Sequence, residues 1–138
     1  VQGMRAAGWT DVPVLAVETH GAASYAAALA AGRPVTLDAI TTLALTLGAR
    51  TVCERSVALA QVHPISSWTC DDRAAVAGCG AFLDDHRVLV EPSCGAALAA
   101  VYGRAPAVLD APSVLVVVCG GAAVTREQLG AWERSVGG

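Results

Sequence analysis

The stretch Val12-Pro-Val-Leu-Ala-Val17 points to the fold class, because it is a short and nearly continuous apolar run. Such a run is typical of a strand buried on both faces, as in a parallel sheet. Residues 21–31 follow, rich in alanine, and predict a helix that ends at Gly32, with Pro34 just beyond. A buried strand followed by a helix indicates a layered fold that mixes the two elements.

The same alternation continues along the chain. Further helices are predicted at 38–47, 51–62, 71–83, 92–102 and from Thr125 onward, where Gln128 completes a capping box. Further short strands are predicted at 65–69, 88–90 and 114–118. The last of these consists of four valines and one leucine, and predicts a central strand buried on both faces. The pattern predicts an α/β fold of three layers, a mostly parallel buried sheet with helices on both faces.

Composition limits the classes of protein. The chain has 138 residues, of which 54% are hydrophobic and 15% charged, so it can bury one core and is not disordered. Its net charge of −3 argues against a nucleic-acid partner, and its longest apolar run is too short to span a membrane. Five cysteines without a C-x-x-C pair predict reduced thiols in a cytoplasmic protein.

Lysine is absent, because all nine basic positions are arginine. Chemistry that needs a lysine Schiff base or a Walker-type lysine therefore cannot be completed by this chain alone. The chain begins at Val1 inside a short helical stretch, and we expect residues 1–138 to be the C-terminal piece of a longer protein.

The first candidate site is Val118-Cys-Gly-Gly121, which follows the predicted 114–118 strand. Cys119 would stand at the carboxyl end of the sheet, where open α/β sheets bind ligands, and Gly120 and Gly121 would let the backbone approach a ligand closely. The alternative is a buried cysteine at the end of a strand, before an ordinary turn.

The second candidate site lies at Glu18-Thr-His-Gly21, after the first strand. Glu18 is either a ligand-binding carboxylate or a solvated or capping side chain. Glu18 and His20 share a face, so a metal pair is conceivable, although no third ligand follows at a recognisable spacing. The predicted helix end at residues 45–49 leaves carbonyl groups that are hydrated, capped by Gly48 or directed at a cation.

Other polar and small residues have simpler interpretations. The stretch 90–98 is interpreted as a small-residue helix that packs tightly, and His63 and His86 as surface residues. A serine-hydrolase site is not indicated, because the chain has no G-x-S-x-G motif.

Four segments in this order resemble one known family. They are Val17-Glu-Thr-His-Gly-Ala22, Thr51-Val52, Val90-Glu-Pro-Ser-Cys-Gly-Ala-Ala-Leu-Ala-Ala-Val-Tyr102 and Val116-Val-Val-Cys-Gly-Gly121. The family is the eukaryotic-type serine dehydratases, which are pyridoxal-phosphate enzymes of the tryptophan-synthase-β fold type. The resemblance extends over essentially all of residues 1–138 and places them in the second half of the family's large domain.

The resemblance implies two sets of site residues. Cys119 would approach the pyridine nitrogen of the cofactor as a neutral thiol, with Gly120 and Gly121 beside it. A monovalent cation, normally potassium, would be bound by a carboxylate and main-chain carbonyls at Glu18, Ala22, Thr46, Leu47 and Ala49. The family's Schiff-base lysine and its phosphate-binding glycine loop have no counterpart in this chain.

The activity that the resemblance implies is the conversion of L-serine, and of L-threonine, by β-elimination with release of ammonia. The whole enzyme would be a cytoplasmic homodimer that acts on a small amino acid. A related threonine deaminase, a serine racemase-like enzyme and a non-catalytic α/β binding module remain as alternatives.

Overall fold

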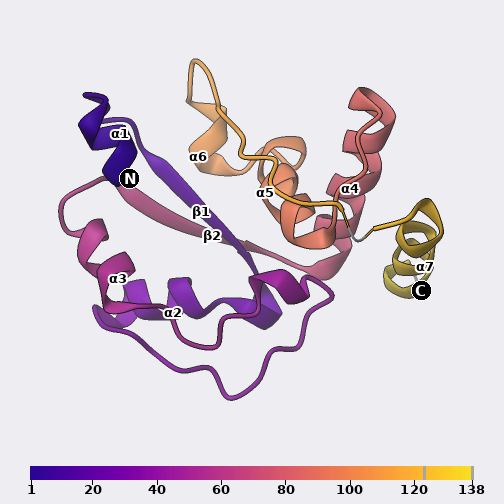
Figure 1. Ribbon diagram of the computed structural model, residues 1–138, viewed down its shortest axis with the longest axis horizontal. Helices are drawn as coiled ribbons and strands as arrows, with labels where there is room; N and C mark the ends of the chain where they lie inside the picture. Colours follow the sequence, from indigo (N-terminus) through magenta and orange to yellow (C-terminus); the bar gives the residue numbers. More distant parts are fainter. Residues whose placement is uncertain (123, 138) are drawn as a thin grey trace.

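Two parallel strands lie between helices in the computed structural model, which describes residues 1–122 and 124–137. Strand β1 (Val14–Thr19) pairs with β2 (Ile65–Cys70), with Val14 opposite Ile65 and Thr19 opposite Cys70. Helices cover both sides of this pair, as Figure 1 shows. The prediction of an α/β fold with a parallel sheet between helical layers is therefore confirmed.

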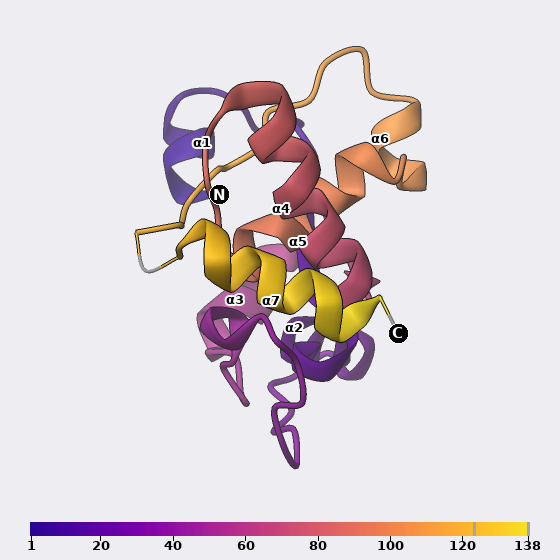
Figure 2. The same ribbon diagram turned by 90° about the vertical axis from the view of Figure 1, so that its right-hand side faces the viewer.

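The helices follow one another along the chain with short connections. They are α1 (Gln2–Ala6), α2 (Ser24–Ala31), α3 (Glu54–Ala60), α4 (Asp72–His86), α5 (Pro92–Tyr102), α6 (Pro106–Leu109) and α7 (Arg126–Val136), with 3₁₀ turns η1 (His20–Ala22) and η2 (Leu45–Leu47). Helices α2 and α3 lie on one side of the strands, and α4 and α5 on the other (Figure 1). Helix α7 packs against α4 on the outside (Figure 2). None of these described helices combines the length and the apolar character that a membrane crossing requires.

Several helix ends fall where the sequence predicts them. The Asp71 carboxylate accepts a hydrogen bond from the Ala74 amide at 2.7 Å and so caps α4. The Thr125 hydroxyl accepts one from the Gln128 amide at 3.1 Å and caps α7. Helix α2 ends at Gly32, whose φ of 65° is the left-handed conformation that favours glycine.

The main core lies between α4, α5 and α7. Six buried side chains form it: Val76, Cys79, Val90, Cys94, Leu98 and Leu129. A second, smaller cluster of Cys70, Ala75, Ala96 and Ala99 joins α5 to the strands. The prediction that the small-residue helix at 90–98 packs tightly is confirmed, since most of its residues are buried.

The predicted helix at 38–47 is wrong, because this stretch is irregular up to the short η2 turn. Its backbone is bound elsewhere: the Thr41 amide donates to the Gly21 carbonyl at 3.0 Å, and the Leu43 amide to the Asp72 carboxylate at 2.9 Å. The β-branched run Ile40-Thr-Thr42 also has weak helix propensity. These tertiary bonds replace the bonds that a helix would have made.

The predicted strands at 114–118 and 88–90 are also wrong. Residues 113–121 have no strand partner within the described chain, and Leu115 and Val117 are 81% and 70% exposed. A strand exists only when a neighbouring backbone completes its hydrogen-bond ladder, and apolar composition alone does not supply that neighbour. The 114–118 segment is therefore extended and partly exposed, rather than central and buried.

Two smaller corrections concern the start of β1 and His63. The first strand begins at Val14 instead of residue 12, since its first ladder bond is the Val14 amide to the Pro64 carbonyl at 2.9 Å. His63, predicted at the surface, is buried, with Nε2 at 2.9 Å from the Val12 carbonyl. His86 is exposed, as predicted.

Candidate functional site

The Cys119 thiol is exposed at the end of the extended 114–118 segment. Its predicted place at the end of a central strand is wrong, because the segment forms no strand. Its exposure equally contradicts the alternative of a cysteine buried in the core. Cys53 is also exposed, whereas Cys70, Cys79 and Cys94 are buried.

Gly120 and Gly121 approach the chain just before α5 very closely. A Cβ on Gly120 would stand 2.6 Å from Oε1 of Glu91, and a Cβ on Gly121 would overlap the Leu89 carbonyl oxygen. No side chain fits at either position unless its neighbour moves. The glycine pair is thus required by packing against residues 89–91, and the space expected there for a ligand is filled on this side by Glu91.

Three influences raise the pKa of the Cys119 thiol above its usual value. Partial burial is the largest, followed by the neighbouring Cys94 thiol, while the Glu91 carboxylate adds a smaller effect of the same sign. A negative charge nearby disfavours the thiolate, so Cys119 is held as a neutral thiol near pH 7.

Glu91 is the residue that the sequence analysis missed. Its Oε1 accepts a hydrogen bond from the Thr46 hydroxyl at 2.9 Å, and Thr46 also bonds to the Ser93 hydroxyl. These contacts join the η2 turn to the start of α5, beside Gly120. The only signal in the sequence is that Glu91 precedes Pro92 at a helix start, which is too common to indicate a role.

Glu18 is buried at the end of β1, and its carboxylate binds the start of α2. Oε1 accepts from the Tyr25 amide at 2.8 Å and Oε2 from the Ala26 amide at 2.9 Å. The sequence left open whether Glu18 binds a ligand or caps a helix, and these two contacts are those of a capping side chain. Each carboxylate oxygen has two acceptor sites, so both retain capacity for another partner.

The η2 turn carries the other predicted cation ligands. The Leu47 carbonyl accepts from the Ala49 amide at 2.8 Å. Within the described chain, no amide donates to the carbonyl oxygens of Ala22, Thr46 or Ala49. Leu47 and Val17, the residue before Glu18, pack against the same cluster of small side chains from β2, α4 and α5.

The acidic side chains near His20 have structural partners. A cavity of about 280 Å³ is lined by His20, Gly21, Thr41, Asp71 and Asp72. Asp71 caps α4, and Asp72 accepts from the Thr42 hydroxyl and the Leu43 amide. Across residues 1–122 and 124–137, no group of three or more His, Cys, Asp or Glu side chains is placed to hold a metal ion.

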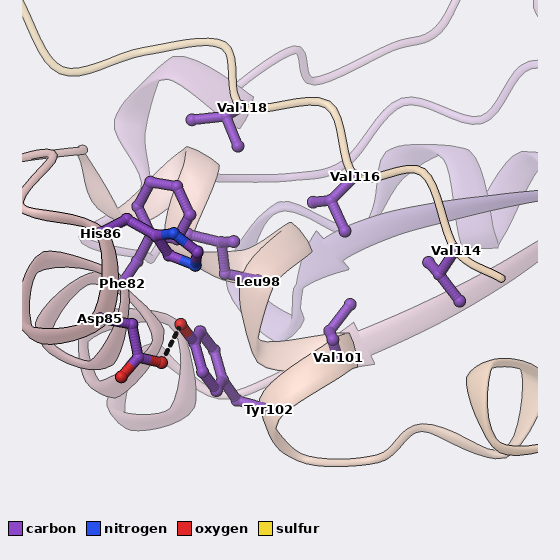
Figure 3. Close-up of a pocket in the computed structure, with 9 residues that line it drawn as sticks. All are labelled: Phe82, Asp85, His86, Leu98, Val101, Tyr102, Val114, Val116 and Val118. Atoms are coloured by element: carbon purple, nitrogen blue, oxygen red, sulfur yellow. Dashed lines mark hydrogen bonds between the residues drawn. The ribbon is translucent and has the colours of Figure 1, made fainter.

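The 114–118 segment covers an apolar cavity of about 380 Å³ (Figure 3). Val114, Val116 and Val118 face it from the segment, opposite side chains of α4 and α5. Most of the lining side chains are apolar, and at one end the Tyr102 hydroxyl donates a hydrogen bond to Asp85 at 2.8 Å. The cavity therefore offers packing surface rather than a polar binding site.

Comparison with known proteins places the chain. The family model described as "Pyridoxal-phosphate dependent enzyme" matches residues 1–120. The chain belongs to the pyridoxal-phosphate dependent enzyme family. This family match includes Glu18, the η2 turn, Glu91, Cys119 and Gly120, and it ends one residue before Gly121.

The curated relatives of this pyridoxal-phosphate dependent family member are named as serine dehydratases or as similar to them. The human "L-serine dehydratase/L-threonine deaminase" is 46% identical over 145 residues, covering 99% of this chain and 44% of the human protein. The rat "Serine dehydratase-like" protein is 48% identical over 139 residues, covering 94% of this chain and 42% of the rat protein. The chain thus spans less than half the length of these relatives.

Solved structures agree on the fold. A fungal L-serine ammonia-lyase from Rhizomucor miehei superposes with a TM-score of 0.89 at 32% identity, covering 96% of this chain and 44% of the fungal chain. Threonine deaminase isoform 2 from Solanum lycopersicum superposes with a TM-score of 0.78 at 22% identity, covering 97% and 38%. The second likeness supports the fold alone.

Proposed function

We propose that this chain forms the cofactor-ring side of a pyridoxal-phosphate-dependent ammonia-lyase that acts on L-serine and L-threonine. The observation that carries the proposal is its 46% identity, over 99% of the chain, to the human protein named "L-serine dehydratase/L-threonine deaminase". The overall reaction would convert L-serine into pyruvate and ammonia by β-elimination. This chain has no lysine, so the covalent attachment of the cofactor would come from outside it.

The chemistry of Cys119 supports its assignment to the cofactor ring. When bound, pyridoxal phosphate supplies an electron sink for the charge left at the α-carbon after deprotonation. An exposed thiol with a raised pKa can contact the ring nitrogen without the negative charge of a carboxylate. Cys119 would thereby moderate the electron sink, with the Gly120 and Gly121 backbone fixing its position.

We include in this proposal a monovalent cation site, with potassium as the expected ion. Its ligands would be the Glu18 carboxylate and the carbonyl oxygens of Ala22, Thr46, Leu47 and Ala49. The support is that Glu18 is a buried carboxylate with acceptor capacity left, and that three of these carbonyls receive no amide bond within the described chain. Hard oxygen donors of this kind suit an alkali cation.

The assembly and location that accompany this proposal are a homodimer in the cytoplasm. Both rest on the resemblance to serine dehydratases.

A chimera tests the function directly. In it, residues 1–138 replace the aligned 44% of the human relative, which retains its own remaining sequence. With pyridoxal phosphate added, we expect the chimera to form pyruvate from L-serine. Pyruvate is measured by a coupled assay, in which lactate dehydrogenase reduces it and oxidises NADH. A folded, cofactor-loaded chimera that converts neither L-serine nor L-threonine would refute the proposal, and formation of D-serine alone would favour the racemase alternative.

Two cysteine variants of the chimera form a matched pair. Cys119→Ala should retain the cofactor absorbance but slow elimination, on the order of tenfold to a hundredfold, because a single positioned donor is lost. Cys53→Ala removes the other exposed thiol among the five cysteines, at the start of α3, and should leave turnover unchanged. Equal rates in the two variants would remove Cys119 from the mechanism.

A further inference from the structure

Glu91 stands between two segments that are far apart in the sequence. On one side it accepts the Thr46 hydroxyl bond at 2.9 Å, and Thr46 opens the stretch to which we assign the cation carbonyls. On the other side its carboxylate lies against Gly120, where a Cβ would come within 2.6 Å of Oε1 and 3.1 Å of the carboxylate carbon. One side chain therefore contacts both the η2 turn and the segment that carries Cys119.

The position of Glu91 itself is well fixed. It is the N-cap residue of α5, and its carbonyl accepts the amides of Cys94 at 3.0 Å and Gly95 at 2.9 Å. Pro92 follows, with its ring fixing the first helical turn. The next residue, Ser93, bonds to the same Thr46 hydroxyl. A rigid helix start thus holds the carboxylate in place.

The partners of Glu91 do not neutralise its charge. Among residues 1–122 and 124–137, its side chain accepts a hydrogen bond from the Thr46 hydroxyl and lies against the Gly120 backbone, and neither group is a cation. In the segment 119–121, the Cys119 thiol is the titratable group that experiences this charge. A carboxylate whose hydrogen bond comes from a neutral hydroxyl can act on a neighbouring thiol through both its shape and its electric field.

We propose that Glu91 is a positioning residue of the cofactor site, which links the η2 turn to Gly120 and thereby fixes where the neutral Cys119 thiol stands. This inference deepens the proposed function and rests on it for the role of Cys119. Through this link, binding of a cation at the η2 turn would also affect the position of Cys119 beside the cofactor ring. Glu91 itself touches neither substrate nor reacting atoms in this scheme.

Alkylation of cysteines tests the link without any cofactor. The 138-residue chain is treated with iodoacetamide at pH 8, and each cysteine is quantified by peptide mass spectrometry. Glu91→Gln keeps the shape and removes the charge, so more Cys119 thiolate forms and its alkylation should accelerate, by up to about threefold. Cys53 is the internal reference, and Glu127→Gln, an exposed carboxylate in the first turn of α7, is the matched control. The Cys53 rate should not change in Glu91→Gln, and Glu127→Gln should leave the Cys119 rate unchanged.

A second pair of variants tests the contact itself. Gly120→Ala should change the alkylation rate of Cys119, because the new methyl group meets the Glu91 carboxylate. In the double variant, Glu91→Ala removes that carboxylate and should restore the Cys119 rate. In the chimera, we expect Glu91→Ala to weaken pyridoxal-phosphate binding about tenfold, measured by absorbance titration.

The outcomes separate this inference from the proposed function. An unchanged Cys119 rate in Glu91→Gln, or equal effects of Gly120→Ala with and without Glu91, would overturn the positioning role. Slow alkylation of the buried Cys70, Cys79 and Cys94 in the same spectra shows that a variant is folded. Where Glu91→Ala does not fold, Glu91→Gln provides the test. A failure of the proposed function would appear separately, as a wild-type chimera without turnover.

Discussion

Gly78 of α4 lies directly against Gly95 of α5, so that a Cβ on Gly78 would stand 2.5 Å from the Gly95 carbonyl oxygen. A Cβ on Gly95 would in turn overlap the Ala75 carbonyl and the Cys79 sulfur. The two helices are therefore as close as their backbones allow. This contact holds the start of α5, and with it Glu91, against the rest of the core.

Replacing Gly95 by alanine should therefore destabilise the chain. We expect a loss of about 1–3 kcal/mol in the free energy of unfolding, because a methyl group is forced into a filled core. Gly130 in the middle of α7 is the matched control: its Cβ would meet only the Arg134 guanidinium at 3.4 Å. Gly130→Ala should raise stability by up to about 1 kcal/mol. Urea unfolding followed by circular dichroism measures both, and equal effects would show that α4 and α5 are not packed so closely.

Glu18→Gln should weaken the junction between β1 and α2. The carboxylate accepts two backbone amides, whereas a glutamine side chain has one acceptor oxygen and would direct its own amide at the other. We expect a loss of about 1–3 kcal/mol in unfolding free energy, since a buried amide is left without a partner.

Glu54→Gln is the control for Glu18, because Glu54 is an exposed carboxylate in the first turn of α3. Its stability change should stay within about 0.5 kcal/mol. If potassium stabilises the wild-type chimera in a thermal melt and Glu18→Gln abolishes that effect, the cation assignment gains direct support. An undiminished potassium effect in the variant would remove Glu18 from the site.

The five thiols should alkylate at very different rates. Burial raises the pKa of Cys70 to about 11 and that of Cys79 to about 12, so at pH 8 about one molecule in a thousand or fewer carries either thiolate. Hydrogen bonds from Ser56 lower the pKa of Cys53, which should react first, with Cys119 following. Raising the pH from 8 to 9 should accelerate alkylation of Cys70 and Cys79 about tenfold and that of Cys53 by less, as measured by peptide mass spectrometry. A uniform rate would contradict the described burial.

Local signals in the sequence were sufficient for the helices that carry their own caps. Asp71, Gly32 and Thr125 all act at helix ends as predicted, because capping depends on residues within one turn. The helix predicted at 38–47 failed where distant partners, Gly21 and Asp72, hold the backbone instead. No local pattern reports such bonds.

The candidate site divides in the same way. Cys119 and Glu18 could be selected because each ends an apolar run, a position that is visible in the sequence. Glu91 could not, since its role depends on a contact with Thr46, 45 residues away, and on the close approach of Gly120. His63 was placed at the surface for the same reason: its burial arises from packing against Val12, which the sequence around it does not indicate.

Treatment of the chain with pyridoxal phosphate and borohydride should label no side chain. The sequence contains no lysine, so the α-amino group of Val1 is its one primary amine of the reactive kind. Peptide mass spectrometry of the reduced sample should therefore find a pyridoxyl group at Val1 or nowhere. The chimera, which brings lysines from the human relative, is the positive control. A label on any internal peptide would mean that another side chain captures the aldehyde.

Neighbouring side chains of the extended 114–118 segment alternate between the core and solvent. Val116 packs against the main core, whereas Leu115 beside it is 81% exposed. Val116→Ser should thus cost about 1–2 kcal/mol of unfolding free energy, because a methyl-rich side chain leaves an apolar contact and a hydroxyl enters it. Leu115→Ser should change stability by less than about 0.5 kcal/mol, although leucine is the larger residue. Urea unfolding of the two variants compares them directly. Since a shift of one residue along an extended segment exchanges its faces, a larger loss for Leu115 than for Val116 would show that the segment lies on the core in the opposite register.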